Sequence, residues 1–348
     1  MMKDTLEPGE IVDKYKVVSH FMDGTFGPLY LVENLNVPVR SILKVSLPFD
    51  ELEDQIKGTN ALACAKVDHK ERAINEANIT ARFNHPHIIK VVDLVDVHDK
   101  YKAVVYEHVA EPQNLEQVIS QANELRMYRP LIMEGKKNFR FNNHFFQFAQ
   151  QLNHAVDYIR GQGYLHKDLK PANVIVDSGM MIKIIDFGIA NPIDDCNGIY
   201  ANRLYSPPEF TGEEQHKNSD LWSNALIDFE LLTGKYLFGE KDKQKVEGKM
   251  QSIWEDFRMG NWNTYKQRDE ILDHLSGTVF GSSELFSFPS ERYSGKYIPD
   301  TLENQERIKE DIFRSMFINP PNFQVYIRHA LNVDPEERSL EKMHPDHR

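Results

Sequence analysis

The sequence contains very little cysteine and no long hydrophobic run. Only two of its 348 residues are cysteines, Cys64 and Cys196, and neither stands in a spacing typical of metal ligands. We therefore predict free thiols in a reducing compartment, with neither a disulfide framework nor a zinc site. No run of about eighteen apolar residues is present, so no transmembrane helix is expected.

The amino-terminal segment and the overall charge narrow the compartment and the partners. Residues 1–10 (MMKDTLEPGE) lack the charged-then-apolar order of a signal peptide. The formal net charge of −12 disfavours binding to nucleic acid or to anionic membranes. We therefore expect a soluble cytoplasmic protein with neither nucleic acid nor membrane as a partner. The nucleus stays open, because the lysines of 241–245 are too interspersed to predict a nuclear signal.

The first third of the chain has the patterning of an antiparallel sheet with one helix. β-branched and aromatic residues predict three strands in a meander, and two further strands are predicted around a His-Asp-Lys turn at 98–100. Residues 71–83, between these two groups, have helical spacing. The meander strands are expected at 15–21, 29–34 and 41–47. A helix against such a sheet defines an α+β lobe.

Helical patterning dominates beyond residue 110. Phe148, Leu152, Val156 and Ile159 fall on one face of a helix that is predicted to end at 161–163. Three segments are expected to be long loops or insertions, namely 47–69, 126–143 and 239–319. The last of them is either a packed irregular loop or a surface for a regulatory or scaffold partner.

A predicted hairpin brings an amide and a carboxylate together. Two apolar strands, 174–176 and 181–185, flank the turn 177–180. If the hairpin is symmetric about Gly179 and Met180, Asn173 and Asp186 face each other. Cross-strand neighbours have Cβ atoms ~5 Å apart. Their oxygen atoms would then share a hard cation such as Mg²⁺.

Asp168 and Lys170 lie just upstream of this hairpin. They alternate with Leu169, so both are expected to point into one cleft while the leucine points to the core. A carboxylate beside a metal-bound phosphate accepts a hydroxyl proton, and an adjacent ammonium neutralises charge on a phosphoryl group in transfer. This pattern predicts phosphoryl-transfer chemistry.

The stretch 166–173 (HKDLKPAN), followed by Asp186-Phe187-Gly188, resembles the catalytic loop and metal-binding segment of eukaryotic-type protein kinases. The resemblance extends from about residue 13 to residue 340. It implies a bilobal α+β fold, with a small antiparallel β-sheet lobe carrying one main helix and a larger, mainly helical lobe. We expect the lobes at 13–108 and 109–348, with an insertion around 239–319.

The same resemblance implies a nucleotide site for ATP. The turn 22–29 resembles the glycine-rich loop, and Lys44 follows at the position of the phosphate-binding lysine. Glu76 is the expected ion-pair partner of Lys44, with Glu71 as the fallback. Tyr106 resembles the gatekeeper at the start of the hinge. The implied nucleotide-binding residues are Met22, Gly24, Gly27, Leu29, Ile42, Lys44, Glu76, Tyr106, Glu107, Val109 and Ile175.

Three further motifs resemble structural parts of the family. The stretch 207–209 (PPE) resembles the end of the activation segment, and Arg338 matches the arginine that pairs with its glutamate. Asp220 resembles the aspartate that braces the catalytic loop from the next helix.

The sequence also departs from the family pattern. Lys167 replaces an arginine that reads a phosphate on the activation segment. The only hydroxyl residues of that segment, which spans 186–209, are Tyr200, Tyr205 and Ser206. We therefore predict activity without activation-segment phosphorylation. The other departures are Met22 for a glycine, Ile42 for an alanine over the adenine, Thr80 for an aliphatic residue and Asn202 for a threonine.

These features favour an ATP-dependent serine/threonine protein kinase. In it Asp168 and Lys170 are catalytic, Asn173 and Asp186 hold Mg²⁺, and the substrate is a protein. The alternative is a weakly active or inactive pseudokinase that acts as a binding or scaffolding module, which Met22, Ile42 and Thr80 would suit. A small-molecule kinase is disfavoured by the resemblance at 207–209 and Arg338 to protein-substrate machinery.

Overall fold

The computed structural model describes residues 6–56, 68–124, 143–195, 204–207, 216–234, 236, 330 and 338. The chain forms two compact units, one of Met1–Val118 with Gln151–Asn224 and the other of Ile119–Gln150 with Ala225–Arg348. Every nucleotide-binding, catalytic and metal-binding residue expected from the sequence lies in the first unit. The predicted lobe boundary after residue 108 stays a prediction.

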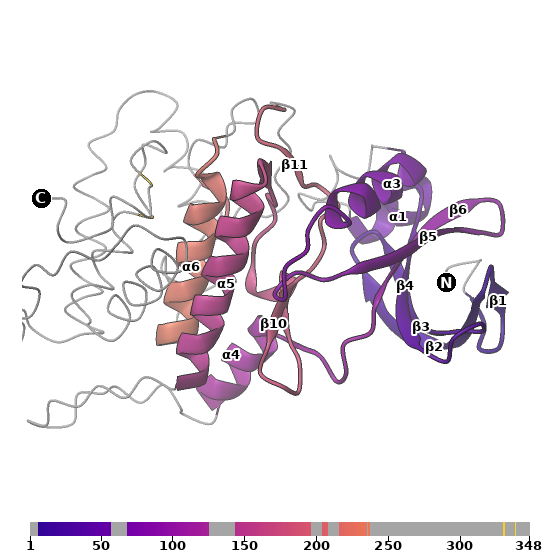
Figure 1. Cartoon of the computed structure of the whole chain (residues 1–348), viewed down its shortest axis with the longest axis horizontal. Coiled ribbons are helices and arrows are strands. Elements are labelled where there is room, and N and C mark those ends of the chain that lie inside the picture. The colour runs from indigo at the N-terminus through magenta and orange to yellow at the C-terminus, as the bar shows by residue number, and fades with distance from the viewer. Residues whose placement is uncertain are drawn as a thin grey trace, which may run out of the picture. The chain divides into compact units, whose positions relative to one another are not determined.

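The amino-terminal part forms a six-stranded antiparallel sheet (Figure 1). Its strands are β1 (Ile11–Val12), β2 (Tyr15–Gly24), β3 (Gly27–Asn34), β4 (Arg40–Ser46), β5 (Val91–Val97) and β6 (Tyr101–Glu107). They lie in the order β1-β2-β3-β4-β6-β5. The predicted three-stranded meander and the two strands around the turn at 98–100 are confirmed.

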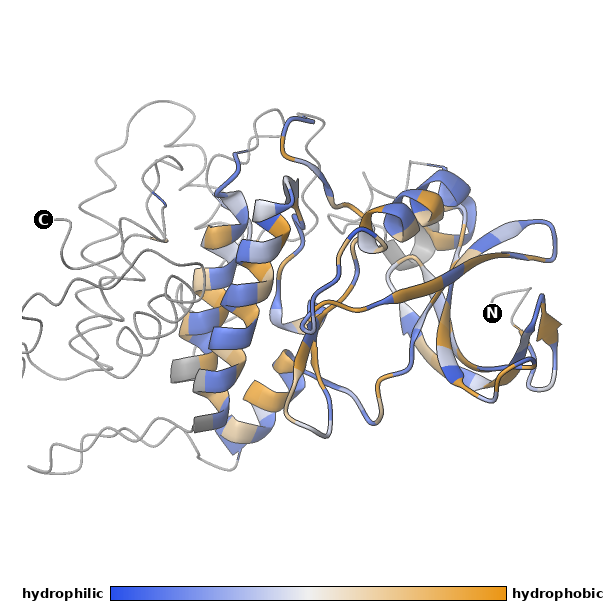
Figure 2. Cartoon of the chain, viewed as in Figure 1, coloured by the Kyte–Doolittle hydropathy of each residue, from blue (hydrophilic) through white to orange (hydrophobic). Residues whose placement is uncertain are grey.

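Strand alternation gives the sheet two different faces. Tyr30, Val32, Leu43 and Val45 belong to one buried apolar cluster. Residues of the other parity, such as Lys44, point to the opposite face, because successive side chains on a strand alternate. Figure 2 shows this alternation of hydrophobic and hydrophilic residues along the strands. The chain thus separates a dry core from the face that carries the candidate site.

Helix α3 (His69–Thr80) lies on the face of the sheet that carries Lys44. Asp68 caps its amino terminus, with its side chain accepting from the backbone N–H groups of Lys70 and Glu71. The helix predicted at 71–83 is therefore confirmed, but it begins and ends a few residues earlier.

The expected loop at 47–69 was wrong in its first part, because residues Phe49–Ile56 form helix α1. Leu52 is fully buried in the apolar cluster of the sheet, and the acidic Asp50 and Glu51 stand in the first turn. Acidic side chains there are favourable to the helix dipole. A helix of two turns is too short to show a clear period in the sequence.

The remaining described elements follow the hinge. They are β7 (Gln113–Asn114), α4 (Leu115–Glu124), α5 (Asn143–Gly161), β8 (Tyr164–Leu165), the 3₁₀ turn η1 (Pro171–Asn173), β9 (Val174–Val176), β10 (Ile182–Ile184), β11 (Asn191–Pro192) and α6 (Ser219–Thr233). The predicted helix before Gly161 is confirmed, with Phe148, Leu152, Val156 and Ile159 all buried. None of the described helices is long and apolar enough to cross a membrane.

The predicted hairpin forms, but its register differs by one residue. Val174 pairs with Ile184, so Asn173 faces Ile185, whose N–H donates to the carbonyl of Asn173 at 3.0 Å. Asp186 therefore lies one residue beyond the expected partner of Asn173. The cause is a turn of five residues, 177–181, in which Met180 has a φ of 62°.

Several sequence predictions fall outside the described residues. They concern Cys64, Cys196, Tyr200, Asn202, Glu209, most of the segment 126–143 and the insertion 239–319.

Candidate active site

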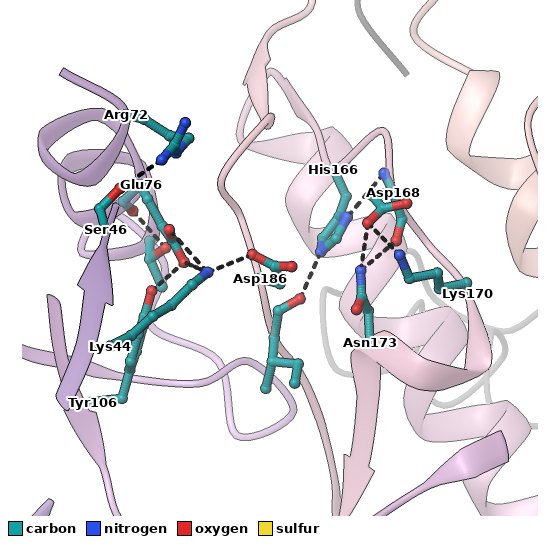
Figure 3. Close-up of polar contacts among 12 residues, drawn as sticks. Lys44, Ser46, Arg72, Glu76, Tyr106, His166, Asp168, Lys170, Asn173 and Asp186 are labelled. Carbon is teal, nitrogen blue, oxygen red and sulfur yellow. Dashed lines mark hydrogen bonds and ion pairs between the residues drawn. The ribbon is translucent and has the colours of Figure 1, made fainter. Parts of the chain in front are cut away.

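Lys44 lies at the centre of a buried ion-pair group. Its ammonium donates to both carboxylate oxygens of Glu76, at 2.9 and 3.1 Å, and to Oδ1 of Asp186 at 2.7 Å. The structure thus joins Lys44 to Glu76, while the fallback Glu71 is exposed at the start of α3. Figure 3 shows Asp186 between this group and the loop that carries Asp168.

Opposite charges set the protonation of this group. Burial alone would lower the pKa of Lys44, but Asp186 and Glu76 outweigh it and hold that pKa above its ordinary value. Burial would likewise raise the pKa of Asp186, yet the Lys44 ammonium lowers it to about 2. Lys44 and Asp186 are therefore both charged at neutral pH.

The second polar group centres on Asp168. Its Oδ2 accepts from Lys170 Nζ at 2.8 Å and from the side-chain amide of Asn173 at 2.8 Å. The other oxygen, Oδ1, is buried and has no hydrogen-bond partner among the described residues. An unsatisfied buried carboxylate oxygen is costly in a fold and marks a place for a ligand donor.

The pKa of Asp168 is raised to about 6. Burial is the main cause, and the Lys170 ammonium opposes it. A carboxyl group with a pKa close to neutral is suited to accept a proton during catalysis.

The main chain of the catalytic loop is held by the start of α6. The Asp220 carboxylate accepts from the N–H groups of His166 and Lys167, at 2.6 and 3.1 Å. Lys167 has a φ of 68°, so the chain turns sharply just before Asp168. The predicted bracing contact of Asp220 is confirmed.

His166 connects this loop to the segment before Asp186. Burial lowers the pKa of His166, so its ring is neutral at neutral pH. Nε2 lies 3.0 Å from the carbonyl of Ile185, and Nδ1 accepts from the N–H of Asp168 at 3.2 Å. These contacts fix one tautomer, with the proton on Nε2.

Asp186 itself is held by its neighbour. Phe187 is fully buried, with its ring 4.6 Å from that of His166 and 5.2 Å from that of Phe83. Asp186 adopts a φ of 67° and points toward Lys44. The packed aromatic ring thus orients the carboxylate.

Cross-strand pairing positions the expected nucleotide contacts. Leu29 lies directly opposite Lys44, and Ile42 lies opposite Tyr106. Met22 is opposite Leu29 and is 49% exposed, so its side chain does not fill the core. The sheet therefore collects these residues on one face.

The glycine-rich loop is a tight turn in which Gly24 pairs with Gly27. Gly27 has a φ of 143°, and a Cβ atom there would lie 2.1 Å from the carbonyl oxygen of Val45. Only glycine fits this conformation and this close approach. Phe26, between them, is buried beneath the guanidinium of Arg72, 4.6 Å from its ring centre. Sequence reasoning missed this contact between the loop and α3.

The hinge residues lie at the end of β6. Oε1 of Glu107 accepts from the N–H of Lys90 at 3.0 Å and from Lys183 Nζ at 2.9 Å. Val109 is buried, and Ile175 on β9 is half-buried opposite Lys183. The Glu107 side chain is therefore engaged within the protein.

Asn173 and Asp186 supply the oxygen ligands that a hard divalent cation prefers. The amide nitrogen of Asn173 donates to Asp168, so the amide oxygen is the atom that could bind a cation. Among the described residues, no group of three or more His, Cys, Asp or Glu side chains is arranged as a metal site. A cation here would accordingly complete its shell with phosphate and water oxygens, which Mg²⁺ favours.

The protein kinase domain family matches residues 55–345, which is more than half of the chain. The chain therefore belongs to the protein kinase family, and its sheet and helices are the bilobal α+β fold of that family. The match begins after Lys44, so the glycine-rich loop and Lys44 rest on the geometry described above.

Three curated relatives are similar to this chain at low identity. A probable serine/threonine-protein kinase KIN1 homolog of Enterocytozoon bieneusi is 33% identical over 52% of this chain and 28% of its own length. The carbon catabolite-derepressing protein kinase of Candida tropicalis is 25% identical over 68% of this chain and 34% of its own length. The mitogen-activated protein kinase p38b of Drosophila melanogaster is 28% identical over 50% and 46%. The chain thus spans less than half of each relative.

Proposed function

We propose that this protein is an active serine/threonine protein kinase that transfers the γ-phosphate of Mg·ATP to a protein hydroxyl. The observation that carries the proposal is the buried, unpaired Oδ1 of Asp168, held beside Lys170 and facing the same region as the Lys44–Asp186 ion pair. A scaffold without chemistry has no need for such an arrangement, because an unsatisfied buried oxygen costs stability.

Asp168 orients the acceptor hydroxyl through Oδ1 and accepts its proton. Its other oxygen is held by Lys170 and Asn173. Lys170, on the opposite side of the carboxylate, neutralises charge on the phosphoryl group as it moves. Lys44 donates to the α- and β-phosphates and is kept in place by Glu76.

Asn173 and Asp186 would hold the Mg²⁺ ion through their oxygen atoms. When bound there, the ion would supply positive charge against the phosphates. The low pKa of Asp186 keeps its carboxylate ionised for this role. Asp186 also accepts from the Lys44 ammonium, so the expected metal ligand and the expected phosphate-binding lysine lie side by side.

The nucleotide contacts come from one face of the sheet and from the hinge. Leu29 and Ile42 cover one face of the base, and Ile175 supports the opposite face. Backbone groups of Glu107 and Val109 meet the edge of the base. The glycine-rich loop from Met22 to Gly27 covers the phosphates.

The hydroxyl specificity rests on Lys170, which follows Asp168 by two residues as in serine/threonine kinases. The curated relatives named above include a serine/threonine-protein kinase homolog by name. The partner surface expected in 239–319 stays a prediction.

Activity without activation-segment phosphorylation is supported by burial. Of the three hydroxyl residues in that segment, Tyr205 is 4% and Ser206 2% exposed. The carbonyl of Tyr205 also accepts from the hydroxyl of Ser223 at 2.7 Å, which ties this stretch to α6. A protein kinase acting on this segment would find neither of these two hydroxyls accessible. Lys167, where a phosphate-reading arginine is usual, is buried as well.

The test is transfer of labelled γ-phosphate from ATP to generic proteins and to the protein itself, with and without Mg²⁺, followed by phosphoamino-acid analysis. The protein is first treated with a phosphatase. Mg²⁺-dependent phosphoserine or phosphothreonine is the expected result. No transfer under any condition, with the protein folded, would favour the alternative of a scaffolding pseudokinase.

A further inference from the structure

The hydroxyl of Tyr106 reaches the same carboxylate as Lys44. It donates to Oε1 of Glu76, which also accepts from the Lys44 ammonium. Tyr106 comes from β6 and Lys44 from β4, so Glu76 is held by two donors on two neighbouring strands (Figure 3). Tyr106 is 7% and Glu76 3% exposed, and water does not substitute easily for either bond.

The donors of Lys44 are all occupied by carboxylates. An ammonium group has three N–H donors, and the three contacts of Lys44 are two with Glu76 and one with Asp186. A phosphate oxygen that binds Lys44 therefore replaces at least one of these bonds. When the lost bond is one to Glu76, the buried carboxylate loses part of its compensation, which is costly.

We propose that Tyr106 is a positioning residue for nucleotide binding, whose hydroxyl holds Glu76 while Lys44 turns one N–H to the phosphates. This inference rests on the proposed function, in which Lys44 binds ATP. It assigns Tyr106 a role through its hydroxyl that is separate from any contact of its ring with the base.

The surroundings of Tyr106 suit this role. Burial, with the nearby Glu76 carboxylate, raises the pKa of Tyr106 well above its ordinary value, so the phenol remains a donor. Thr80, one turn further along α3, donates to the carbonyl of Glu76 at 2.7 Å. Glu76 is thus fixed through its side chain and its backbone. The unusual Thr80 hydroxyl has a partner within its own helix.

The first test compares ATP binding by the full chain and by the variant Tyr106→Phe, measured by calorimetry with Mg²⁺. The change removes one hydroxyl and keeps the ring. We expect ATP binding about tenfold weaker. The variant lacks the hydroxyl that holds the buried Glu76 carboxylate when Lys44 turns one N–H to the phosphates. The KM for a protein substrate should not change.

Tyr101→Phe is the matched control. Tyr101 lies on the same strand and also donates to a carboxylate, that of Glu51 at 2.9 and 3.0 Å. That carboxylate does not contact Lys44, so ATP affinity should equal that of the unchanged chain. If Tyr106→Phe binds ATP as tightly as the control, the proposal is overturned. A merely structural tyrosine would lower the folded fraction in both variants and leave the affinity of the folded protein intact.

The second test does not involve nucleotide. Hydrogen exchange of the α3 amides is compared in Lys44→Met, Tyr106→Phe and the double variant. Tyr106 is expected to keep α3 protected in Lys44→Met, and only the double variant should lose protection, by about tenfold or more. Equal loss in Lys44→Met and the double variant would overturn the proposal. A chain that binds ATP but transfers no phosphate would refute the proposed function and leave both tests valid.

Discussion

Lys44 and Asp186 stand 142 residues apart in the sequence and are joined by an ion pair of 2.7 Å. The pair links the strand that is expected to meet the nucleotide with the segment that is expected to hold the metal ion. It sets the charges of both residues before any ligand arrives, because each shifts the pKa of the other.

This ion pair predicts an acid-sensitive contribution to stability. The pKa of Asp186 is about 2 in the folded protein and is ordinarily 3.8, so the stabilisation is present above pH 4 and is lost as the pH falls through 2. We expect it to be about 2 kcal/mol. Urea unfolding of Asp186→Asn and of the unchanged chain between pH 2 and pH 5 measures the difference. Asp96→Asn, at an exposed ion pair, is the control. Parallel pH curves for Asp186→Asn and the unchanged chain would contradict the prediction.

The raised pKa of Asp168 predicts the acid limb of the rate profile. Since burial raises that pKa to about 6, kcat/KM should fall about tenfold for each pH unit below 6. The Lys170 ammonium opposes the shift, so Lys170→Met should move the limb to higher pH as well as slow the reaction. Protonation of the ATP phosphates does not depend on this variant, so a moved limb would be assigned to Asp168. An unmoved limb in Lys170→Met would remove Asp168 as the titrating group.

Gly27 is predicted to tolerate no side chain. Its φ is 143°, and a Cβ atom at this position would come within 2.1 Å of the Val45 carbonyl oxygen. Gly27→Ala should therefore be destabilising by about 2–4 kcal/mol. Gly161→Ala is the matched control, because nothing lies within 4 Å of a Cβ at that position. Thermal unfolding of the two variants provides the comparison. Equal melting temperatures for the two variants would contradict the close approach of Gly27 to the Val45 carbonyl oxygen.

Asp220 is predicted to matter for stability, because its carboxylate holds two backbone N–H groups of the catalytic loop. Asp220→Asn places an amide nitrogen against one of two N–H donors and should cost about 2–3 kcal/mol. Asp157→Asn removes a partly exposed carboxylate from a pair with Arg160, and should cost less than about 1 kcal/mol. Urea unfolding measures both. Similar costs for the two variants would show that Asp220 does not brace the loop.

Much of the fold was readable from local patterns. The strands and α3 follow from alternation and helical spacing, and the pairing of Lys44 with Glu76 follows from resemblance to the family. The register of the 174–184 hairpin was not readable, because one residue in a left-handed turn, Met180, shifts it. Helix α1 was also missed, since two turns carry too little periodicity.

The site contacts that were missed are those between residues distant in sequence. The bond from Tyr106 to Glu76 joins residues 30 apart in the sequence. The contact of Phe26 with Arg72 likewise joins the glycine-rich loop to helix α3. Local propensity contains no such information. A tyrosine at the start of the hinge and an arginine one turn before Glu76 were the available signals.

The most direct measurement compares Asp168→Asn with the unchanged chain for transfer of labelled γ-phosphate from Mg·ATP to serine or threonine. ATP affinity of the two proteins is measured alongside. The variant should bind ATP normally, because Asp168 makes no contact with Lys44 or Glu76, and should transfer at least about 10²-fold more slowly. Equal rates in the two proteins, or no transfer by the unchanged chain, would contradict the account.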